Sequence, residues 1–530
     1  MSPVRRPARV WPCPTGPELR AIEADAIQRL GLPARMLMEN AGRAVAEAIA
    51  DLYTERRRPL VACGGGNNGG DGYVLARVLA EQGRGVVPLV LDLARPEAQS
   101  PEAKANRELL ETARIETCRV ENAADVTAAL AGCDLVVDAV FGIGLTRPVE
   151  GRLADILRAL AASGLPCVAV DLPSGRSSET GLPLGMALDA DLIVTLGLPK
   201  LGLALWPTTA RILVAEIGLP LESIARANVR QHVLSRAAAA ALLPSRPLDG
   251  HKGTFGHVLV VGGSLGKTGA ALLAAQGALR GGAGLVSLAA TRSLLPIYAS
   301  RLAEVMSVVL DDTPAGALAA IHAETLARAL ETRDALVLGP GLGQDSGSAA
   351  LARALLARAR VPAVVDADAL NAFGGELEAL RSPAARILTP HPGEAARLLG
   401  CSTAEVQSDR AAAARALASR SGAIAILKGA RSVVAAPDGA LCVNPTGGPG
   451  LAAGGSGDVL AGLVGALLGQ GCSAWDAARA GTFLHGLAGD LGPSVGGLAG
   501  ELAGRIPAAW QLLSASGDEA DEPRTLVPFP

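Results

Sequence analysis

The fold of the first half of the chain is decided by residues 59–77, PLVACGGGNNGGDGYVLAR. The run 59–63 predicts a buried strand, a glycine loop follows, and a helix is expected from about residue 71 to 82. Gly64, Gly66 and Gly69 satisfy the spacing G-x-G-x-x-G, and Asp92 ends the next apolar run. In a strand–loop–helix unit this spacing is typical of backbone amides that face a dinucleotide pyrophosphate.

The glycine spacing alone is a weak signal, because a chain with 64 glycines produces such triplets by chance. Asn67, Asn68 and Asp71 are also atypical of a dehydrogenase loop. Their amide and carboxylate oxygens could ligate a cation as well as a sugar or a phosphate. The loop therefore predicts a polar ligand site of one of these kinds.

Strand and helix patterns alternate around this loop. Helices are expected at 17–30 behind a Thr15 cap, at 33–53, near 101–113 and at 151–162. Strands are expected at 85–91, 133–140, 166–170 and 190–196. This alternation indicates a mostly parallel sheet flanked by helices.

The pattern breaks near residues 220–240, which we interpret as a connector without a strand, leading into a helix. The run 257–261 then restarts the alternation, and further strands are expected at 284–290, 335–338, 363–365, 386–388, 423–427 and 432–436. Two α/β domains in tandem are the simplest account. Their expected bounds are 1–225 and 226–515, with a disordered tail over 516–530.

Composition limits the classes of protein. A chain of 530 residues that is 49% hydrophobic needs two or three domains. A net charge of -3 with interspersed signs argues against nucleic acid as a partner, and no apolar run reaches the roughly 20 residues that a membrane span needs. The N-terminus lacks the apolar core of a signal peptide, and the 8 cysteines lack metal-ligand spacing. We expect a soluble cytoplasmic protein that forms a homo-oligomer.

Two further strands of the first half end on acidic, glycine-bearing loops. Asp138 begins DAVFGIGLTRP and Asp171 begins DLPSG. Ligands of an open parallel sheet bind at the carboxyl ends of its strands. Either acid alone is as well explained by a turn or a cap, but three such ends in one domain indicate a shared crevice.

The second half carries its own set of loops. The segment GGSLGKT is one residue short of a P-loop, so its glycines are interpreted as a strand-to-helix turn. GPGLG, VVDADAL, LTPHPGE and LKGARS each follow an expected strand. His391, taken alone, is interpreted as a satisfied core histidine.

The most informative loop of the second half is GGSGDVLAG, which ends in Asp458 at a helix start. A plain helix cap by Asp458 is the ordinary alternative. Backbone amides beside a carboxylate are also the arrangement that phosphoryl transfer requires, because the amides hold the charge and the acid takes the acceptor's proton. Only five lysines occur in the chain, and Lys200, Lys252, Lys267 and Lys428 fall in or beside these motifs.

In order and spacing, NNGGDG, DAVFGIGL-x-RP and DLPSG resemble the NAD(P)H-hydrate epimerase family over about residues 10–220. The resemblance implies a Rossmann-like three-layer α/β domain in which Asp171 is catalytic and contacts the substrate. Potassium would be bound by Asn68, Asp138 and Ser174. The hydrated cofactor would be held by Asn67, Asn68, Gly69, Gly70, Asp71, Gly142, Ile143, Gly144, Leu145, Thr146, Arg147 and Pro148. Arg176 departs from the family, which usually has Leu there.

The second set, HKGTFGHVLVVGGS through GGSGDVLAG, resembles ribokinase-like ADP- or ATP-dependent NAD(P)H-hydrate dehydratases over about residues 240–512. The resemblance implies a magnesium-assisted reaction in which Asp458 is the catalytic base. The adenine nucleotide would be bound by Lys428, Gly429, Ala430, Arg431, Ser432 and Gly457. The hydrate would contact Ala270, Gly341, His391 and Asp458.

The two resemblances together imply a bifunctional enzyme that repairs hydrated NADH and NADPH. The first domain would epimerise the R and S hydrates, and the second would dehydrate the S hydrate. Lys200 is either a helper of Asp171 or a surface lysine. One alternative is a thiazole- or sugar-type kinase with an accessory nucleotide-binding domain, and another is a nucleotide sensor without turnover.

Overall fold

The computed structural model describes residues 10–94, 99–515 and 526–530. Its contacts divide the chain into two compact units, with the division between His232 and Val233. The N-terminal unit holds residues 11–232 together with the C-terminal residues 526–530, and the C-terminal unit holds residue 10 and residues 233–515. The division therefore falls later than the expected boundary at residue 225.

The N-terminal unit is built on an eight-stranded sheet of order β19-β8-β7-β6-β5-β2-β3-β4. Its strands are β2 (Pro59–Cys63), β3 (Leu89–Asp92), β4 (Thr117–Arg119), β5 (Leu135–Ala139), β6 (Cys167–Val170), β7 (Leu192–Leu196), β8 (Arg211–Ala215) and β19 (Leu526–Pro528). All pairs are parallel except β19 with β8. The chain order reverses between β2 and β5, which is where an open sheet binds ligands.

Strand β19 corrects the expectation of a disordered tail over residues 516–530. Leu526, Val527 and Pro528 pair antiparallel with the edge strand β8. Their ladder partners lie about 310 residues earlier in the chain, so no local pattern could reveal the pairing. Residues 516–525 lie outside the described residues.

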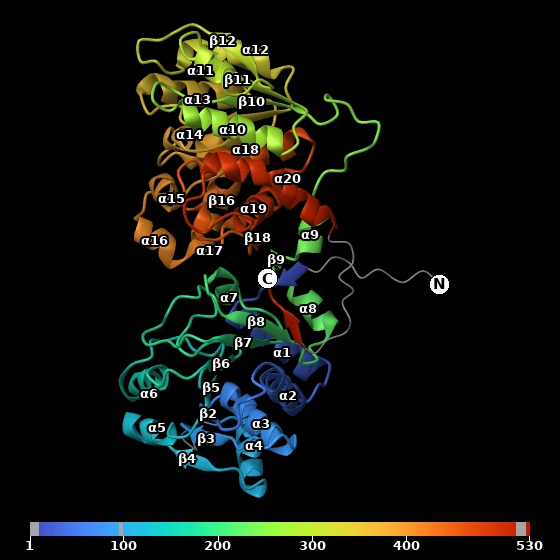
Figure 1. Ribbon diagram of the computed structural model, residues 1–530, viewed down its shortest axis with the longest axis vertical. Coiled ribbons are helices and arrows are strands. Elements are labelled where there is room, and N and C mark those ends of the chain that lie inside the picture. The colour runs from blue at the N-terminus through green and yellow to red at the C-terminus, as the bar shows by residue number, and fades with distance from the viewer. Residues whose placement is uncertain (1–9, 95–98, 516–525) are drawn as a thin grey trace. The chain divides into compact units, whose positions relative to one another are not determined.

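Helices cover both faces of this sheet (Figure 1). Val61 and Cys63 point into a core formed with α2 (Ala34–Leu52), α3 (Asn67–Glu81) and α4 (Pro101–Thr112). Leu60 and Ala62 point into the opposite core, formed with α5 (Ala123–Ala129) and α6 (Gly151–Ala161). This alternation confirms the expected three-layer α/β architecture.

The C-terminal unit contains most of an eleven-stranded sheet of order β1-β9-β18-β17-β16-β15-β14-β13-β10-β11-β12. The strands are β1 (Val10–Pro12), β9 (Gln231–Leu234), β10 (His257–Val261), β11 (Leu285–Thr291), β12 (Met306–Leu310), β13 (Ala335–Leu338), β14 (Ala363–Val365), β15 (Arg386–Leu388), β16 (Ile424–Leu427), β17 (Val433–Ala435) and β18 (Leu441–Val443). From β12 to β16 neighbouring strands are parallel, and β16, β17 and β18 pair antiparallel. The expectation of no strand within 220–240 is wrong, because β9 lies there.

One face of this sheet is covered by α10 (Thr268–Arg280), α18 (Ser456–Gly469), α19 (Ala474–Asp490) and α20 (Ala499–Ala515). Helices α10 and α18 approach closely through glycine. A Cβ atom at Gly462 would lie 1.9 Å from the Ala274 carbonyl oxygen, and one at Gly277 would lie 2.3 Å from the Val459 carbonyl oxygen. With only 2% aromatic residues, the chain fills its core by bringing backbones together instead of inserting rings.

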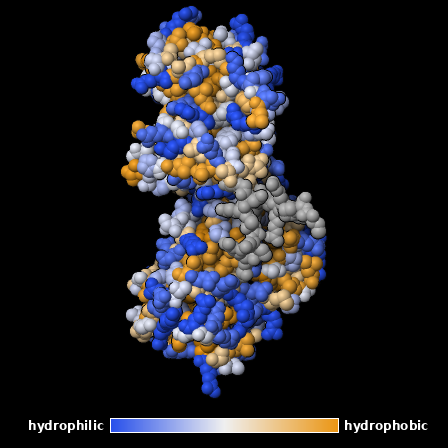
Figure 2. Space-filling view, turned by 45° about the vertical axis from the view of Figure 1, so that its right-hand side comes forward, coloured by the Kyte–Doolittle hydropathy of each residue, from blue (hydrophilic) through white to orange (hydrophobic). Residues whose placement is uncertain are grey.

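The remaining helices complete the two units. They are α1 (Gly16–Ala24), α7 (Leu201–Leu205), α8 (Leu221–Ala227), α9 (Arg236–Ala240), α11 (Leu295–Ala299), α12 (Ala323–Leu330), α13 (Ser346–Arg358), α14 (Asp368–Asn371), α15 (Pro392–Leu399), α16 (Thr403–Ser408) and α17 (Arg410–Ser421). Thr15 caps α1 as expected. Within the described ranges, no helix has the length and apolar character needed to cross a bilayer. On the face shown in Figure 2, hydrophilic and hydrophobic residues are intermixed.

Candidate active sites

The NNGGD loop of the N-terminal unit is folded around close backbone contacts at two glycines, Gly64 and Gly69. A Cβ atom at Gly69 would lie 1.9 Å from the Gly64 carbonyl oxygen, and one at Gly64 would lie 2.1 Å from the Val140 carbonyl oxygen. Helix α3 starts at Asn67, behind an N-cap at Gly66 that has no side-chain cap. The start expected at Asp71 is therefore wrong, because the close backbone contact outweighs the low helix propensity of the glycines. Asn67 is exposed, whereas Gly69 and Gly70 are buried.

Asp138 and Ser174 join the ends of β5 and β6. Both side chains are fully buried. Ser174 donates from its backbone N to Asp138 Oδ2 at 2.7 Å and from Oγ to Asp138 Oδ1 at 2.5 Å. The Phe141 backbone N donates to Ser174 Oγ at 2.8 Å. Burial raises the pKa of Asp138 to about 6.

Asp171 is held in a left-handed backbone conformation, with φ of 71°, directly after β6. Its Oδ1 accepts hydrogen bonds from the Leu196 backbone N at 3.1 Å and from Lys200 Nζ. Lys200 Nζ also donates to Thr195 Oγ1 and to the Leu196 carbonyl oxygen, both at 2.9 Å. Lys200 is 0% exposed, so the surface-lysine interpretation is wrong. Such a strained non-glycine residue is typical of a functional position.

Gly142, in the loop after β5, lies beside Asn68 in the loop after β2 and beside Asp171 in the loop after β6. A Cβ atom at Gly142 would lie 3.1 Å from Asp171 Oδ2 and 3.3 Å from Asn68 Oδ1. The Nδ2 atom of Asn68 is buried and has no hydrogen-bond partner within the described residues. The three expected loops therefore do converge at one edge of the sheet.

The rest of the expected substrate loop is open. Ile143 and Leu145 are half-buried, and Gly144, Thr146, Arg147 and Pro148 are exposed. The loop is fastened at one point by Arg20, whose guanidinium donates to the Ile143 carbonyl oxygen at 3.0 Å.

Arg176 packs against Trp206. Its guanidinium stacks 3.6 Å from the centroid of the Trp206 ring and donates to the Gly181 carbonyl oxygen at 3.2 Å and to Asp189 Oδ1 at 2.5 Å. The side chain is 13% exposed. Arg176, which departs from the family pattern, is thus accommodated by these local contacts.

Asp92 is already satisfied by its neighbours. Its Oδ1 accepts from Tyr73 Oη at 3.0 Å and its Oδ2 accepts from Arg107 Nε at 2.6 Å. A cavity of about 310 Å³ adjoins this pair, and it is also lined by Glu111, Ile115, Thr117 and Arg119. Asp92 therefore organises β3 and α4, and both of its carboxylate oxygens are taken by protein donors.

Two acids of this site, Glu23 and Asp71, are distinguished by their environment. Burial raises the pKa of Glu23 to about 6. The positive charge of Lys200 partly offsets this rise, and the negative charge of Asp171 adds to it. Burial, followed by the charges of Asp171 and Glu23, raises the pKa of Asp71 well above its ordinary value. Glu23 was missed by the sequence analysis, although it lies seven residues after Gly16 on an amphipathic helix.

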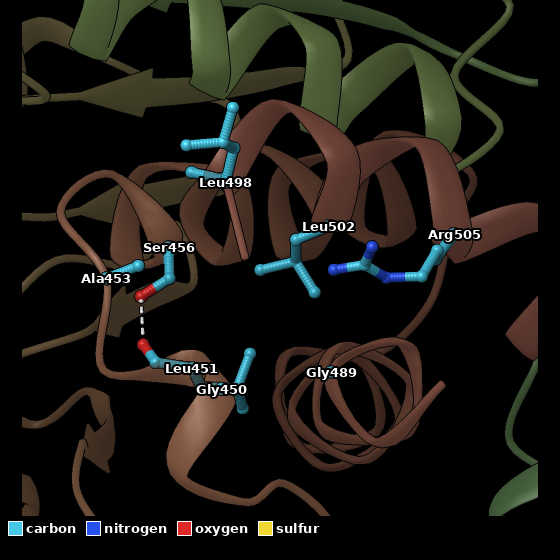
Figure 3. Close-up of a pocket in the computed structure, with 9 residues that line it drawn as sticks. Gly450, Leu451, Ala453, Ser456, Gly489, Leu498, Leu502 and Arg505 are labelled. Carbon is cyan, nitrogen blue, oxygen red and sulfur yellow. Dashed lines mark hydrogen bonds between the residues drawn. The ribbon is translucent and has the colours of Figure 1, made fainter. Parts of the chain in front are cut away.

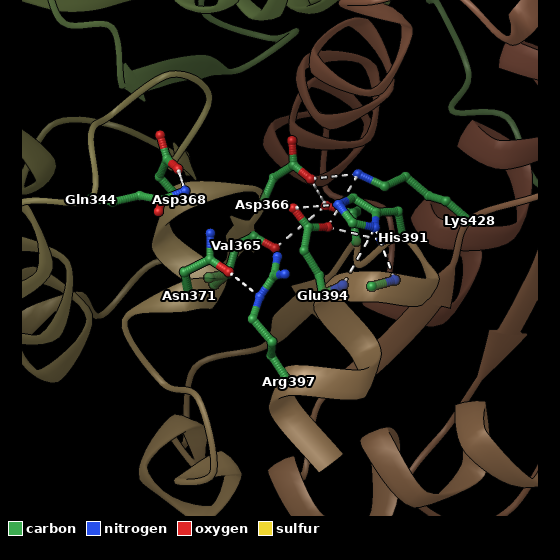
Figure 4. Close-up of polar contacts among 11 residues, drawn as sticks. Gln344, Val365, Asp366, Asp368, Asn371, His391, Glu394, Arg397 and Lys428 are labelled. Atoms are coloured by element: carbon green, nitrogen blue, oxygen red, sulfur yellow. Dashed lines mark hydrogen bonds and ion pairs between the residues drawn. The ribbon is translucent and has the colours of Figure 1, made fainter. Parts of the chain in front are cut away.

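In the C-terminal unit the motif loops follow β13, β14, β15 and β16, which are neighbouring parallel strands. Lys428, directly after β16, donates from Nζ to Asp366 Oδ1 at 2.9 Å and lies 3.9 Å from Glu394 Oε2. Asp366 also accepts from Thr389 Oγ1 at 2.6 Å. Figure 4 shows this group of charges, with Asp368 and Gln344 on its other side.

Asp458 is the third residue of α18. The N-cap of that helix is Gly455, at φ 93° and without a side-chain cap, so the capping interpretation of Asp458 is wrong. Burial raises the pKa of Asp458 to about 7. The negative charge of Asp366 adds to this rise, and the positive charge of Lys428 reduces it. A carboxyl group tuned to this range is suited to take a proton near neutral pH.

His391 is half-exposed, with 52% of its side chain accessible, so the core-histidine interpretation is wrong. It is the N-cap of α15, and its Nδ1 accepts from the Gly393 backbone N at 3.0 Å. Its Nε2 lies 3.5 Å from Glu394 Oε1, beside Lys428 (Figure 4). The prolines on either side of His391, Pro390 and Pro392, gave no indication in the sequence that the side chain is exposed.

Ala270 and Gly341 are neighbours. A Cβ atom at Gly341 would lie 2.9 Å from the Ala270 Cβ, and Gly341 has φ of 62°. Ser264 Oγ fixes the turn by donating to the Gly341 carbonyl oxygen at 2.9 Å. Lys267, three residues before Ala270, lies 3.2 Å from Asp368 Oδ2 through its Nζ.

The expected nucleotide residues form the turn between β16 and β17. Gly429 and Ala430 are exposed, and Arg431 has φ of 53°. Ser432 Oγ donates to the Gly429 carbonyl oxygen at 3.0 Å. Gly457 lies close to Lys428, the residue that starts this turn: a Cβ atom at Gly457 would be 3.2 Å from Lys428 Nζ.

A small cavity lies behind the GGPG-to-GGSGD segment (Figure 3). Its volume is about 10 Å³, and Ser456 Oγ closes one side by donating to the Leu451 carbonyl oxygen at 2.8 Å. The other side is lined by Leu498, Leu502 and Arg505. This space is about that of one water molecule, so it cannot hold a nucleotide.

Comparison with known proteins matches both units. The model of the YjeF-related protein N-terminus matches residues 34–202, and the model of the NAD(P)H-hydrate dehydratase matches residues 258–506. The bifunctional NAD(P)H-hydrate repair enzyme Nnr of Moorella thermoacetica is 43% identical over 486 residues, which are 90% of this chain and 91% of the relative. The chain belongs to the bifunctional NAD(P)H-hydrate repair enzyme family.

Other members of this repair enzyme family are also similar along most of their length. The Escherichia coli member is 37% identical over 495 residues, covering 92% of this chain and 91% of the relative. The solved ADP/ATP-dependent NAD(P)H-hydrate dehydratase of Bacillus subtilis, co-crystallized with ATP/Mg2+, is 31% identical with a TM-score of 0.46. It covers 53% of this chain and 97% of its own.

Proposed function

We propose that the N-terminal unit interconverts the R and S hydrates of NADH and NADPH, and that the C-terminal unit dehydrates the S hydrate with ADP or ATP. The observation that carries the proposal is one arrangement found twice. In each unit an acid, Asp171 or Asp458, lies beside glycine-rich backbone at the carboxyl edge of a parallel sheet. Membership of the repair enzyme family supports the pairing of these two activities in one chain.

The N-terminal reaction acts on a hemiaminal, since the substrate hydroxyl is on the carbon next to the ring nitrogen. The configuration inverts when the C–O bond breaks and water returns to the opposite face of the planar cation. Asp171 faces this centre with Oδ2 and stabilises the cation, while Lys200 fixes its Oδ1. The loops at Asn67–Asp71 and Gly142–Pro148 bind the cofactor around it.

Asn68, Asp138 and Ser174 would hold a potassium ion. Their side chains offer amide, carboxylate and hydroxyl oxygens, the hard ligands that such a cation prefers, and all three residues are buried. When bound, the ion supplies a fixed positive charge beside the substrate. The residues themselves tie β5 to β6 through the Ser174–Asp138 hydrogen bonds.

In the C-terminal unit Asp458 accepts the proton of the substrate hydroxyl as its oxygen attacks the terminal phosphorus of ADP or ATP. The C–O bond of the phosphate ester then breaks, phosphate leaves with its electrons, and loss of a proton from the neighbouring carbon restores the dihydronicotinamide. Lys428 to Ser432 and Gly457 bind the nucleotide, and Ala270, Gly341 and His391 contact the hydrate. Magnesium, when bound, supplies charge neutralisation to the phosphates.

The kinase alternative accounts for the C-terminal unit alone. It gives no role to the buried Lys200–Asp171 pair or to the three converging loops of the N-terminal unit. Matches to repair enzymes over 90% of the chain also favour the bifunctional assignment. Homo-oligomer formation and a cytoplasmic location stay predictions from the sequence.

The proposal is tested by incubating the protein with mixed hydrate epimers, magnesium, potassium and either ADP or ATP. Recovery of reduced-nicotinamide absorbance is followed alongside nucleotide consumption. We expect both epimers to be converted completely, with nucleotide consumed only when hydrate is present. Consumption of nucleotide with a thiazole or sugar, and none with hydrate, would overturn the proposal.

A further inference from the structure

Helix α19 holds the loop of residues 444–457, which joins β18 to the start of α18. Near the beginning of the loop, Thr446 Oγ1 donates to the Phe483 carbonyl oxygen at 2.8 Å. The Gly447 backbone N donates to Asp490 Oδ2 at 3.0 Å. The first part of the loop is therefore fixed to two successive turns of α19.

The same helix holds the far end of the loop through a buried histidine, His485. Only 7% of His485 is exposed, and its Nε2 lies 2.9 Å from the Ser456 carbonyl oxygen. A carbonyl oxygen can only accept a hydrogen bond, so this ring nitrogen carries the proton and donates. Burial lowers the pKa of His485 to about 4, so the ring is neutral near pH 7. The acceptor therefore fixes the histidine in one tautomer.

Ser456 is the first residue of α18, and all three of its polar groups are held. Its backbone N donates to the Ala453 carbonyl oxygen at 3.3 Å, and its Oγ donates to the Leu451 carbonyl oxygen at 2.8 Å (Figure 3). Its carbonyl oxygen accepts from His485. The N-cap, Gly455, has no side chain with which to cap the helix. The start of α18 therefore depends on these contacts for its geometry.

The hydrogen bond from His485 also sets the direction of the next N–H group. The Ser456 carbonyl and the Gly457 N–H belong to one planar trans peptide, in which they point in opposite directions. Fixing the carbonyl therefore directs the N–H toward the N-terminal end of α18, where the first N–H groups of a helix lack partners within it. Glycine at residue 457 allows this peptide to rotate more freely than another residue would. The donor on α19 restricts that rotation.

The Gly457 N–H lies where the nucleotide is expected to bind. Lys428 Nζ lies close to Gly457, and Asp458 follows in the same turn of α18. An ammonium group and an amide N–H that are fixed before the reaction stabilise the charge of a phosphoryl group most effectively. A rotated peptide would instead turn the Ser456 carbonyl oxygen toward the phosphate and repel it.

We propose that His485 is a positioning residue of the dehydration: its N–H holds the Ser456–Gly457 peptide so that the Gly457 N–H donates to the transferred phosphoryl group. This inference rests on the dehydratase function proposed above, in which Gly457 binds the nucleotide. His485 acts through this peptide, and it neither gives nor takes a proton during the reaction.

The test compares His485→Leu, which removes the donor, with His485→Gln, whose amide N–H can take the place of Nε2–H. His322→Leu is the matched control. His322 is also buried in the C-terminal unit, and its Nε2 donates to the Asp311 carbonyl oxygen at 3.1 Å. Dehydration of pure S hydrate is measured with magnesium and either ADP or ATP, as kcat and as KM for the hydrate.

We expect His485→Leu to lower kcat roughly 100-fold, with KM for the hydrate changed less than about threefold, because a misplaced donor to the transition state costs about that much. His485→Gln should keep kcat within about fivefold of wild type, since it restores a neutral donor. His322→Leu should keep it within about twofold, as a substitution away from the site does. Thermal unfolding should show similar destabilisation of the two Leu variants, so a loss of stability would not account for the difference in kcat.

A folded His485→Leu variant with wild-type kcat overturns the proposal. An equal loss of kcat in His485→Gln also overturns it, because the N–H donor would then have no effect. If His485→Leu does not fold, His485→Asn, whose amide is one methylene shorter, must be slower than His485→Gln; equal rates overturn the proposal. A wild-type protein that leaves S hydrate unchanged with both nucleotides overturns the dehydratase function itself.

Discussion

A Cβ atom at Gly457 would lie 3.2 Å from Lys428 Nζ. The ammonium therefore stands against the first turn of α18, one residue from Asp458, while it also donates to Asp366. This places a positive charge where the backbone amides of the helix start already favour an anion. A side chain at residue 457 would therefore crowd the Lys428 ammonium.

Gly457→Ala should therefore weaken nucleotide binding without unfolding the protein. The new methyl group displaces the flexible end of Lys428, not backbone, so the structural cost is small. We expect the Kd for ADP or ATP to rise about tenfold, which corresponds to about 1.4 kcal/mol. Gly454→Ala is the matched control, because a Cβ atom there meets nothing within 4 Å. Equal affinities of the two variants in calorimetry would contradict the assignment.

The rate of dehydration should depend on the ionisation of Asp458. Burial raises the pKa of this carboxyl to about 7, and the base acts in its deprotonated form. The kcat should thus fall as the pH is lowered through about 7 and level off above it. Lys428→Met removes the positive charge that lowers this pKa, so the same limb should move to higher pH. A pH profile that is flat on both sides of 7 would exclude Asp458 as the base.

The NNGGD loop should tolerate no side chain at Gly69. A Cβ atom there would overlap the Gly64 carbonyl oxygen, and backbone cannot move aside as a side chain can. Gly69→Ala should destabilise the N-terminal unit by about 3 kcal/mol or more, in the range of severe packing defects. Gly66→Ala, where the Cβ atom meets nothing within 4 Å, should cost under about 1 kcal/mol. Thermal unfolding of the two variants measures the difference, and similar midpoints would show that the loop is not packed as described.

Arg176→Leu, which restores the residue usual in the family, should cost stability but not activity. The guanidinium is engaged by the Trp206 ring, by the Gly181 carbonyl oxygen and by Asp189. Loss of the stacking should destabilise the N-terminal unit by about 1 kcal/mol. The kcat for epimerisation should stay within about twofold of wild type. A large fall in kcat in a folded protein would place Arg176 in the reaction instead.

The sequence predicted most of the strands that build the two sites, because buried parallel strands are continuous apolar runs. The runs at 59–63, 335–338 and 386–388 became β2, β13 and β15 with the expected bounds. The loops that follow them carried enough glycine and acid to locate both sites. Fold class and family could therefore be predicted before the geometry was known.

The remaining features depend on contacts that are distant in the chain. β19 forms only because β8 offers a free edge, and β9 is a strand of four residues in a segment without a strand pattern. Lys200 is buried because three acceptors surround its ammonium, and His391 is exposed despite apolar neighbours. Glu23 gives no motif at all, since its environment is made by loops more than 45 residues away.

The central claim, that two separate sites act in sequence on one substrate, is tested most directly by complementation. Pure R hydrate is supplied with magnesium, potassium and ADP or ATP, and recovery of reduced cofactor is recorded for Asp171→Asn, for Asp458→Asn and for an equimolar mixture of the two. We expect each variant alone to recover cofactor no faster than spontaneous epimerisation allows, and the mixture to restore recovery because the S hydrate diffuses between molecules. Full recovery by either variant alone, or none by the mixture of folded variants, would contradict the account.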